Sequence, residues 1–179
     1  LVEYDKKFVI IGNLNALTYR DIFKLVKENK LWFGHSIHSG DREFRVPADY
    51  PLHAASSRID EEGNKYIRVK GVRWYTNLDF NERHEDLILY KKYNEEEYPK
   101  YENFDAINVD VTKDIPVDYP GAMGVPITFI DKYNPDQFEI IGLGISNSGI
   151  EIGVQPYKPE HKKYRKEVQK RGAVDGDLY

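Results

Sequence analysis

Short apolar runs and polar joints alternate along the first third of the chain. Residues 8–11 form a continuous apolar run that ends at Gly12-Asn13, and such a run is typical of a strand buried on both faces of a parallel sheet. Residues 18–30 repeat apolar positions with helical spacing and end in cations, and residues 31–34 are apolar again. The order of strand, helix and strand with short joints predicts a βαβ unit.

The pattern changes between residues 35 and 64, where glycines, prolines and scattered charges predict a long loop. Alternation returns over residues 66–75, in which apolar and basic side chains take turns. This segment predicts a strand with a bulge at Gly71. Residues 85–90 are apolar enough to form a further strand antiparallel to it.

The second half of the chain predicts short strands joined by turns. Asn134-Pro135 has the residues that commonly begin a helix, with Asn at the cap and Pro in the first turn. The serine- and glycine-rich segment 144–149 predicts a flexible loop. The basic segment 160–171 has helical propensity and a narrow apolar seam, which predicts a surface helix. Strands are expected at residues 104–111, 138–143 and 150–152.

Composition is that of a soluble protein. The 179 residues are 40% hydrophobic and 31% charged, and a chain of this length can bury one substantial core. No apolar run is long enough to span a membrane and no signal peptide opens the chain, so we expect a cytoplasmic protein. The absence of Cys excludes disulfides and thiolate metal sites. The formal net charge of −4 argues mildly against a dedicated nucleic-acid binder, although binding depends on local charge.

Four stretches together resemble one known family. The longest begins Gly124-Val125-Pro126-Ile127-Thr128-Phe129-Ile130 and is dense in residues with restrictive backbone roles. The stretches are residues 7–13, 74–79, 98–107 and 124–142. They resemble the EcoRI-like adenine-specific DNA methyltransferases, and the resemblance runs from the first residues to Gly142 and weakly beyond.

This resemblance implies an S-adenosylmethionine-dependent adenine-N6 DNA methyltransferase of the kind paired with a restriction endonuclease. Enzymes of the family carry an Asn-Pro-Pro-Phe catalytic motif and a cofactor-binding segment, and both precede the region matched here. The chain therefore resembles the carboxy-terminal part of a larger enzyme, without the catalytic residues or the cofactor segment. Its implied partners are double-stranded DNA and the missing amino-terminal half. Alone, the chain is expected not to methylate DNA.

Two further sequences resemble functional motifs but are interpreted as structural. Asn134-Pro135-Asp136-Gln137-Phe138 lacks the second Pro of the catalytic motif and has its Phe displaced by two positions, so we interpret it as a helix-capping turn. Ile141-Gly142-Leu143-Gly144 resembles a cofactor-binding turn, which must open a helix. Because a loop and a strand are predicted to follow, we interpret it as a hairpin or flexible connection.

The resemblance also implies an aromatic side chain on a late hairpin that stacks on the extruded adenine. Trp74 and Tyr75 are the candidates, and as neighbours on a strand they point to opposite faces, so only one can meet the base. Both could instead be packing residues. Asn77 could bind a base edge or end the strand, and Asn13 could line the site at the carboxyl end of its strand or be a turn residue.

Basic side chains in the region from residue 42 to residue 73 are the candidates for DNA contacts, because Lys and Arg neutralise phosphates and Arg suits guanine edges. A solvated charged surface is the alternative for any one of them. No metal site is expected, since His35 and His38 lack a third clear ligand. The candidate DNA-binding residues are Arg42, Arg45, Arg58, Lys65, Arg68, Lys70 and Arg73.

Together these observations predict an α/β fold, a partial Rossmann-like methyltransferase sheet with an appended, mostly β region. Residues 1–93 are expected to supply the later strands of the catalytic sheet with a long loop at 35–64, and residues 94–179 a mixed β/α region for DNA recognition. The alternative function is a non-enzymatic DNA-binding or scaffold domain that kept the family signature. An Asn-Pro-Pro-aromatic sequence encoded upstream of Leu1 would separate the two.

Overall fold

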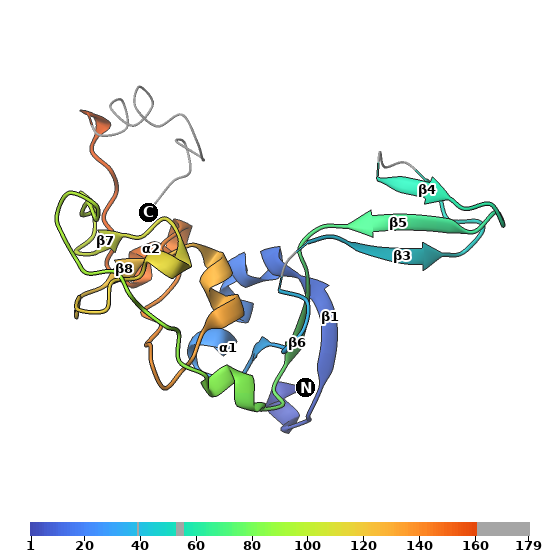
Figure 1. Cartoon of the computed structure of the whole chain (residues 1–179), viewed down its shortest axis with the longest axis horizontal. Helices are drawn as coiled ribbons and strands as arrows, with labels where there is room; N and C mark the ends of the chain where they lie inside the picture. Colours follow the sequence, from blue (N-terminus) through green and yellow to red (C-terminus); the bar gives the residue numbers. More distant parts are fainter. Residues whose placement is uncertain (39, 53–55, 161–179) are drawn as a thin grey trace. The chain divides into compact units, whose positions relative to one another are not determined.

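A computed structural model describes residues 1–38, 40–52 and 56–160 of the chain (Figure 1). The chain divides into unit 1, Leu1–Glu82, and unit 2, Arg83–Tyr179, whereas the sequence placed the change after residue 93. The surface helix predicted for residues 160–171 lies almost wholly outside the described residues. No described helix is both long and apolar enough to pass through a bilayer.

Unit 1 contains a three-stranded antiparallel sheet. After a 3₁₀ turn, η1 (Val2–Tyr4), come β1 (Val9–Asn13), the 3₁₀ helix η2 (Leu14–Thr18), α1 (Arg20–Lys27) and β2 (Trp32–Phe33). This confirms the predicted strand, helix and strand. The later strand β6 (Val72–Thr76) lies between the other two and pairs antiparallel with both, which makes β1 and β2 parallel to each other.

The exposure of β1 differs from the prediction of a strand buried on both faces. Val9, Ile10 and Ile11 are 55%, 44% and 46% exposed. β1 is an edge strand that pairs on one side only among the described strands, so its apolar side chains keep much of their surface in solvent. An apolar run indicates that burial of the segment is favourable, but it does not indicate whether the same chain or another chain buries it.

A second three-stranded sheet, which we call the arm (residues 42–69), is formed by part of the predicted loop 35–64 together with the first half of the strand predicted for residues 66–75. It contains β3 (Arg42–Val46), β4 (Ser57–Ile59) and β5 (Lys65–Val69), with β5 in the middle and both neighbours antiparallel to it (Figure 1). The loop prediction for this part of 35–64 is therefore wrong. The strands are short and rich in charge, which is why their alternation is weak in the sequence.

The arm joins the main sheet through a tight connection between β5 and β6. Gly71 has φ +67°, a backbone region that favours glycine, and a Cβ there would come within 3.4 Å of the Asn13 side chain. The backbone N–H of Leu14 donates to the carbonyl of Gly71 at 2.7 Å. The predicted bulge is thus the turn at which one sheet ends and the other begins.

Unit 2 has few regular elements and a core made by side chains from irregular segments. Its buried residues are Tyr98, Ile107, Val109, Ile115 and Phe129. The short strands β7 (Ile107–Asn108) and β8 (Met123–Gly124) pair in parallel, and the other elements are the 3₁₀ helices η3 (Asn81–His84, at the boundary with unit 1), η4 (Thr112–Asp114) and η5 (Ile127–Lys132) and the helix α2 (Ser146–Glu151).

Several strand predictions in unit 2 are wrong. Of residues 104–111 only β7 is a strand, and residues 85–90 and 138–143 lack regular pairing. The segment predicted as a flexible loop and a strand, 144–152, contains the short helix α2. Near Asn134, hydrogen bonds from a side chain to the backbone of Leu87 take the place of a strand ladder.

Candidate nucleic-acid interface

Two asparagines connect the ends of β1 with neighbouring backbone. Asn77 donates from Nδ2 to the carbonyl of Lys6 at 2.9 Å and accepts at Oδ1 from the N–H of Phe8 at 3.0 Å. Asn13 donates from Nδ2 to the carbonyl of Lys70 at 2.7 Å. Both predicted base-pocket asparagines therefore have structural partners, and their contact with a base stays a prediction.

Tyr75 is a packing residue of the main sheet. Its side chain is 6% exposed, meets the ring of Phe33 edge-on with centroids 5.0 Å apart, and donates its hydroxyl proton to the carbonyl of Asn13 at 2.7 Å. A Cβ at Gly12 would come within 2.9 Å of the Tyr75 ring, so the glycine makes room for it. Packing and a buried hydroxyl partner together fix this ring in place.

Trp74 points to the opposite face of β6 from Tyr75, as the alternation of a strand requires. It is half-buried, and Ile11 of β1 is its partner in register. The N–H of Gly34 donates to the Trp74 carbonyl at 2.9 Å, and a Cβ at Gly34 would come within 3.0 Å of the Trp74 Cβ. Of the two candidate aromatics, Trp74 is the one that keeps accessible surface.

The two faces of the arm differ in chemistry. Register places the side chains of one face in rows across all three strands, and none of the strand residues falls in the buried class. The charged face carries Glu43, Arg45, Arg58, Tyr66 and Arg68. The apolar face carries Phe44, Val46, Ile59, Ile67 and Val69. The arm thus brings three of the predicted DNA-binding arginines to one surface.

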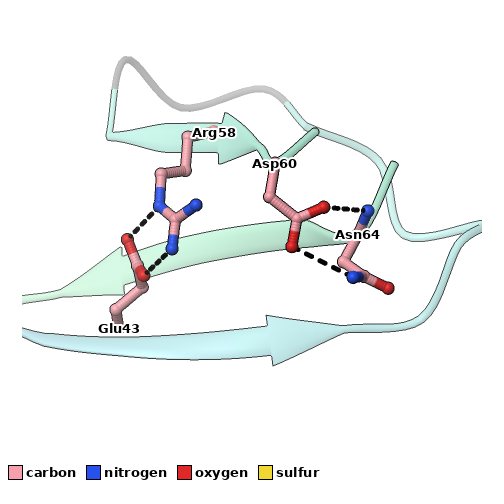
Figure 2. Close-up of polar contacts among 4 residues, drawn as sticks. All are labelled: Glu43, Arg58, Asp60 and Asn64. Carbon is pink, nitrogen blue, oxygen red and sulfur yellow. Dashed lines mark hydrogen bonds and ion pairs between the residues drawn. The ribbon is translucent and has the colours of Figure 1, made fainter. Parts of the chain in front are cut away.

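Arg58 on β4 reaches across the central strand to Glu43 on β3 (Figure 2). Its Nε and Nη2 donate to the two carboxylate oxygens at 2.9 and 2.6 Å, and its guanidinium carbon lies 4.2 Å from the centroid of the Tyr66 ring. The hydrogen bonds and charge of Arg58 lower the pKa of Glu43 below its usual value. This fork geometry ties the outer strands together and fixes the plane of the guanidinium.

Asp60 organises the turn between β4 and β5. Its carboxylate accepts from the backbone N–H of Asn64 at 2.8 Å and from Asn64 Nδ2 at 3.0 Å (Figure 2), and hydrogen bonds from the Asn64 side chain chiefly lower the pKa of Asp60. The Asn64 Oδ1 in turn accepts from Arg45 Nη2 at 2.5 Å. The carboxylate that holds this turn is therefore protonated only at a lower pH than a free Asp.

The remaining basic candidates lie in different surroundings. Arg42 and Lys65 belong by register to the apolar face, and Lys70 is exposed at the end of the arm. Arg73 is 4% exposed, and its Nη2 donates to the carbonyl of His38 at 2.7 Å. The structure thus gathers Arg45, Arg58 and Arg68 and places Arg73 inside unit 1.

Sequence reasoning missed three residues that shape this surface: Glu43, Asp60 and Tyr66. A weak signal for Glu43 was present, because the alternation Arg-Glu-Phe-Arg-Val over β3 is that of a half-exposed strand. The pairing of Glu43 with Arg58, fifteen residues away, follows from the sheet register and has no local signature.

In unit 2, side-chain hydrogen bonds connect Asn134 and Gln137 to Asp86 and Leu87, and we call this set of contacts the clip. Asn134 is 1% exposed; its Oδ1 accepts from the N–H of Asp136 at 2.9 Å and its Nδ2 donates to Asp86 at 2.9 Å. The Gln137 amide accepts from the N–H of Leu87 at 2.7 Å and donates to its carbonyl at 3.0 Å. The interpretation as a structural turn fits these contacts, but the turn is not continued into an α-helix.

Comparison with known proteins gives a family. The family model described as "Adenine-specific methyltransferase EcoRI" matches residues 1–177. The chain belongs to this family. The match of the EcoRI methyltransferase family covers the main sheet, the arm and the clip at Asn134, so all the features described above lie within it. No solved structure matches the chain significantly.

The curated relatives that the chain matches are named Type II methyltransferases. M.EcoRI of Escherichia coli is 51% identical over 162 residues, which are 88% of this chain and 50% of that protein. M.MpnI of Mycoplasma pneumoniae is 40% identical over 145 residues, and M.MgeORF184P of Mycoplasma genitalium is 38% identical over 146 residues; each match covers 79% of this chain and 45% of the relative. The chain spans about half the length of the curated relatives it matches.

Proposed function

We propose that this chain is the carboxy-terminal part of an S-adenosylmethionine-dependent adenine-N6 DNA methyltransferase, acting in the cytoplasm as part of a restriction-modification system. The observation that carries the proposal is the family match over residues 1–177 by a chain that covers only half of M.EcoRI. In this proposal the chain supplies part of the catalytic sheet, one wall of the base pocket and the DNA-binding surface. The remainder of the enzyme supplies the catalytic motif.

The free edge of β1 supports the role of the main sheet. Val9, Ile10 and Ile11 are exposed on an edge strand, and uncovered apolar edges are otherwise a hazard that proteins avoid. A further strand of the missing half would pair with β1 and cover these side chains. β1 and β2 are parallel with an antiparallel β6 between them, an arrangement compatible with one end of a mostly parallel, Rossmann-like sheet.

Trp74 is our candidate for the wall of the base pocket. It keeps accessible surface, whereas its neighbour on the same strand, Tyr75, is buried. Stacking of a nucleobase on an aromatic ring contributes about 1–3 kcal/mol. Asn13 and Asn77 lie at opposite ends of the β1–β6 pair and would border that wall.

The glycine-rich segment at Gly142 does not have the features of a cofactor-binding turn. The glycine-rich segment at Gly142 does not follow a regular strand in the described part of the chain. A Cβ at Gly142 would come within 2.5 Å of the Ile152 side chain, so the absence of a side chain serves internal packing there. We therefore place S-adenosylmethionine binding in the other half of the enzyme and derive no step of methyl transfer through these residues.

Salt-dependent binding to double-stranded DNA tests the proposal. The chain is expected to bind a duplex at low salt. The logarithm of the association constant should fall linearly with the logarithm of the salt concentration, with a slope set by the number of phosphate contacts. Changing Arg45, Arg68 and Lys70 together to Gln is expected to reduce that slope by about 0.9 for each phosphate contact removed. With labelled S-adenosylmethionine, the isolated chain is expected to transfer no methyl group.

The matched control changes Lys24, Lys27 and Lys30 of the α1 region to Gln, which removes the same charge away from the arm. An equal reduction of the slope in both triple variants would show that binding depends on the net charge of the chain and not on the basic residues of the arm region. Binding that is absent at low salt, or methyl transfer by the chain alone, would contradict the proposal.

A further inference from the structure

The fork between Arg58 and Glu43 leaves one edge of the guanidinium unused. A guanidinium has five N–H donors in a fixed plane, and Glu43 occupies the side edge formed by Nε and Nη2. Among the described residues, no hydrogen bond engages Nη1, and Figure 2 shows this third nitrogen without a dashed line. The end edge, formed by Nη1 and the second proton of Nη2, is a second pair of parallel donors.

Guanine is the base that matches such a pair of donors. In the major groove it presents two neighbouring acceptors, N7 and O6, and bidentate Arg is the commonest side chain that reads them. Some DNA-binding proteins read that groove with side chains from β-strands. The arginine here is already oriented: Glu43 holds its side edge and Tyr66 lies under its plane at 4.2 Å.

Glu43 also argues for a base and against a phosphate as the partner of Arg58. A carboxylate beside the guanidinium repels the negatively charged backbone of DNA, whereas its free lone pairs can accept from the exocyclic amine of the cytosine paired with that guanine. Arg68 is the register partner of Glu43 and its charge also acts on that carboxylate, but among the described residues no such fork fixes the Arg68 guanidinium. The two arginines thus differ in how they are held: the Arg58 guanidinium is fixed in a plane suited to a base edge, whereas the Arg68 guanidinium can adapt to a phosphate.

We infer that Arg58 reads a guanine in the major groove of the target DNA and that Glu43 is the positioning residue that holds it for this contact. The inference rests on the proposed function, because it assigns a sequence-reading role to the DNA-binding surface. Beyond the proposed function, the inference names the base that is read: the recognition sequence contains a G·C pair whose major-groove edge contacts the arm.

The test uses the full chain and a duplex enriched from a randomised pool by binding to it. Each guanine is replaced in turn by 7-deazaguanine, which lacks the N7 acceptor, or by inosine, which keeps N7 and O6. At one position 7-deazaguanine is expected to weaken binding of the wild type about 5- to 150-fold, while inosine has little effect. Arg58→Gln and Arg58→Lys should bind the guanine and 7-deazaguanine duplexes almost equally.

Glu43→Gln separates positioning from a merely structural role. Removal of the carboxylate charge is expected to strengthen binding to random DNA while reducing the discrimination between guanine and 7-deazaguanine, since only one acceptor then holds Arg58. Loss of folding would instead lower binding to every duplex. Arg68→Gln is the matched control on the same face and should weaken all duplexes alike without changing discrimination.

The outcomes distinguish this inference from the function on which it rests. If the wild type binds DNA and discriminates against 7-deazaguanine to the same extent as the Arg58 variants, or shows no such discrimination, the assignment to Arg58 is overturned and the DNA-binding proposal stands. If the wild type binds no duplex even at low salt, both are overturned together.

Discussion

Tyr75→Ala is expected to lower the free energy of unfolding of unit 1 by about 3–5 kcal/mol, the range for removing a large buried aromatic side chain. The ring is 6% exposed and packs edge-on against Phe33, and its hydroxyl donates to the Asn13 carbonyl at 2.7 Å. Both tryptophans of the chain, Trp32 and Trp74, lie in unit 1, so the midpoint of a denaturant titration followed by tryptophan fluorescence measures this change.

Tyr75→Phe is the control, because it keeps the ring and removes only the hydroxyl. Its expected cost is about 1 kcal/mol, the contribution of one hydrogen bond. A Tyr75→Ala variant no less stable than Tyr75→Phe would mean that the ring is not part of the core. In that case Tyr75 would return as a candidate for the base-stacking side chain.

Ile107→Ala is expected to destabilise unit 2 by about 2–5 kcal/mol, because the side chain is deleted from a closely packed site. Ile107 is 0% exposed and lies in the core with Tyr98, Ile115 and Phe129. Amide hydrogen exchange measures the effect: the N–H of Ile107, bonded to the Ala122 carbonyl at 3.1 Å, should lose protection in the variant.

Ile88→Ala makes the same chemical change at a site that is 88% exposed in the same unit. Its effect should stay within about 0.5 kcal/mol, as for most surface substitutions. Equal loss of amide protection in the two variants would contradict the assignment of the unit 2 core to the cluster around Ile107.

The hydrophobic periodicity of the sequence correctly predicted several elements of unit 1. The strand, helix and strand up to Phe33 were found where the pattern placed them, and the single strand predicted for residues 66–75 is divided at Gly71 into β5 and β6. The burial of β1 was not, because burial depends on what packs against a strand, and sequence alternation carries no information about a partner. The opposite orientation of Trp74 and Tyr75 followed from the strand, but which of them is buried required the structure.

The arm and unit 2 were harder to predict for different physical reasons. The strands of the arm are three to five residues long and carry several charges, so their hydrophobic signal is weak, and long-range pairs such as Glu43 with Arg58 stabilise the charged face. In unit 2 the Gln137 amide makes both hydrogen bonds to the backbone of Leu87 that a neighbouring strand would otherwise make. Single side chains of this kind leave no periodic pattern.

The geometry at the base of the arm has an evolutionary consequence. Arg42 and Val69, its first and last residues, are partners in register, so their Cα atoms are separated by about 5 Å, the spacing of paired residues in neighbouring strands. An insert whose ends meet can be exchanged for another of different length and sequence without moving the chain on either side. If the arm reads DNA as proposed, exchange of this one segment would change the target sequence and leave the packing around Tyr75 unchanged.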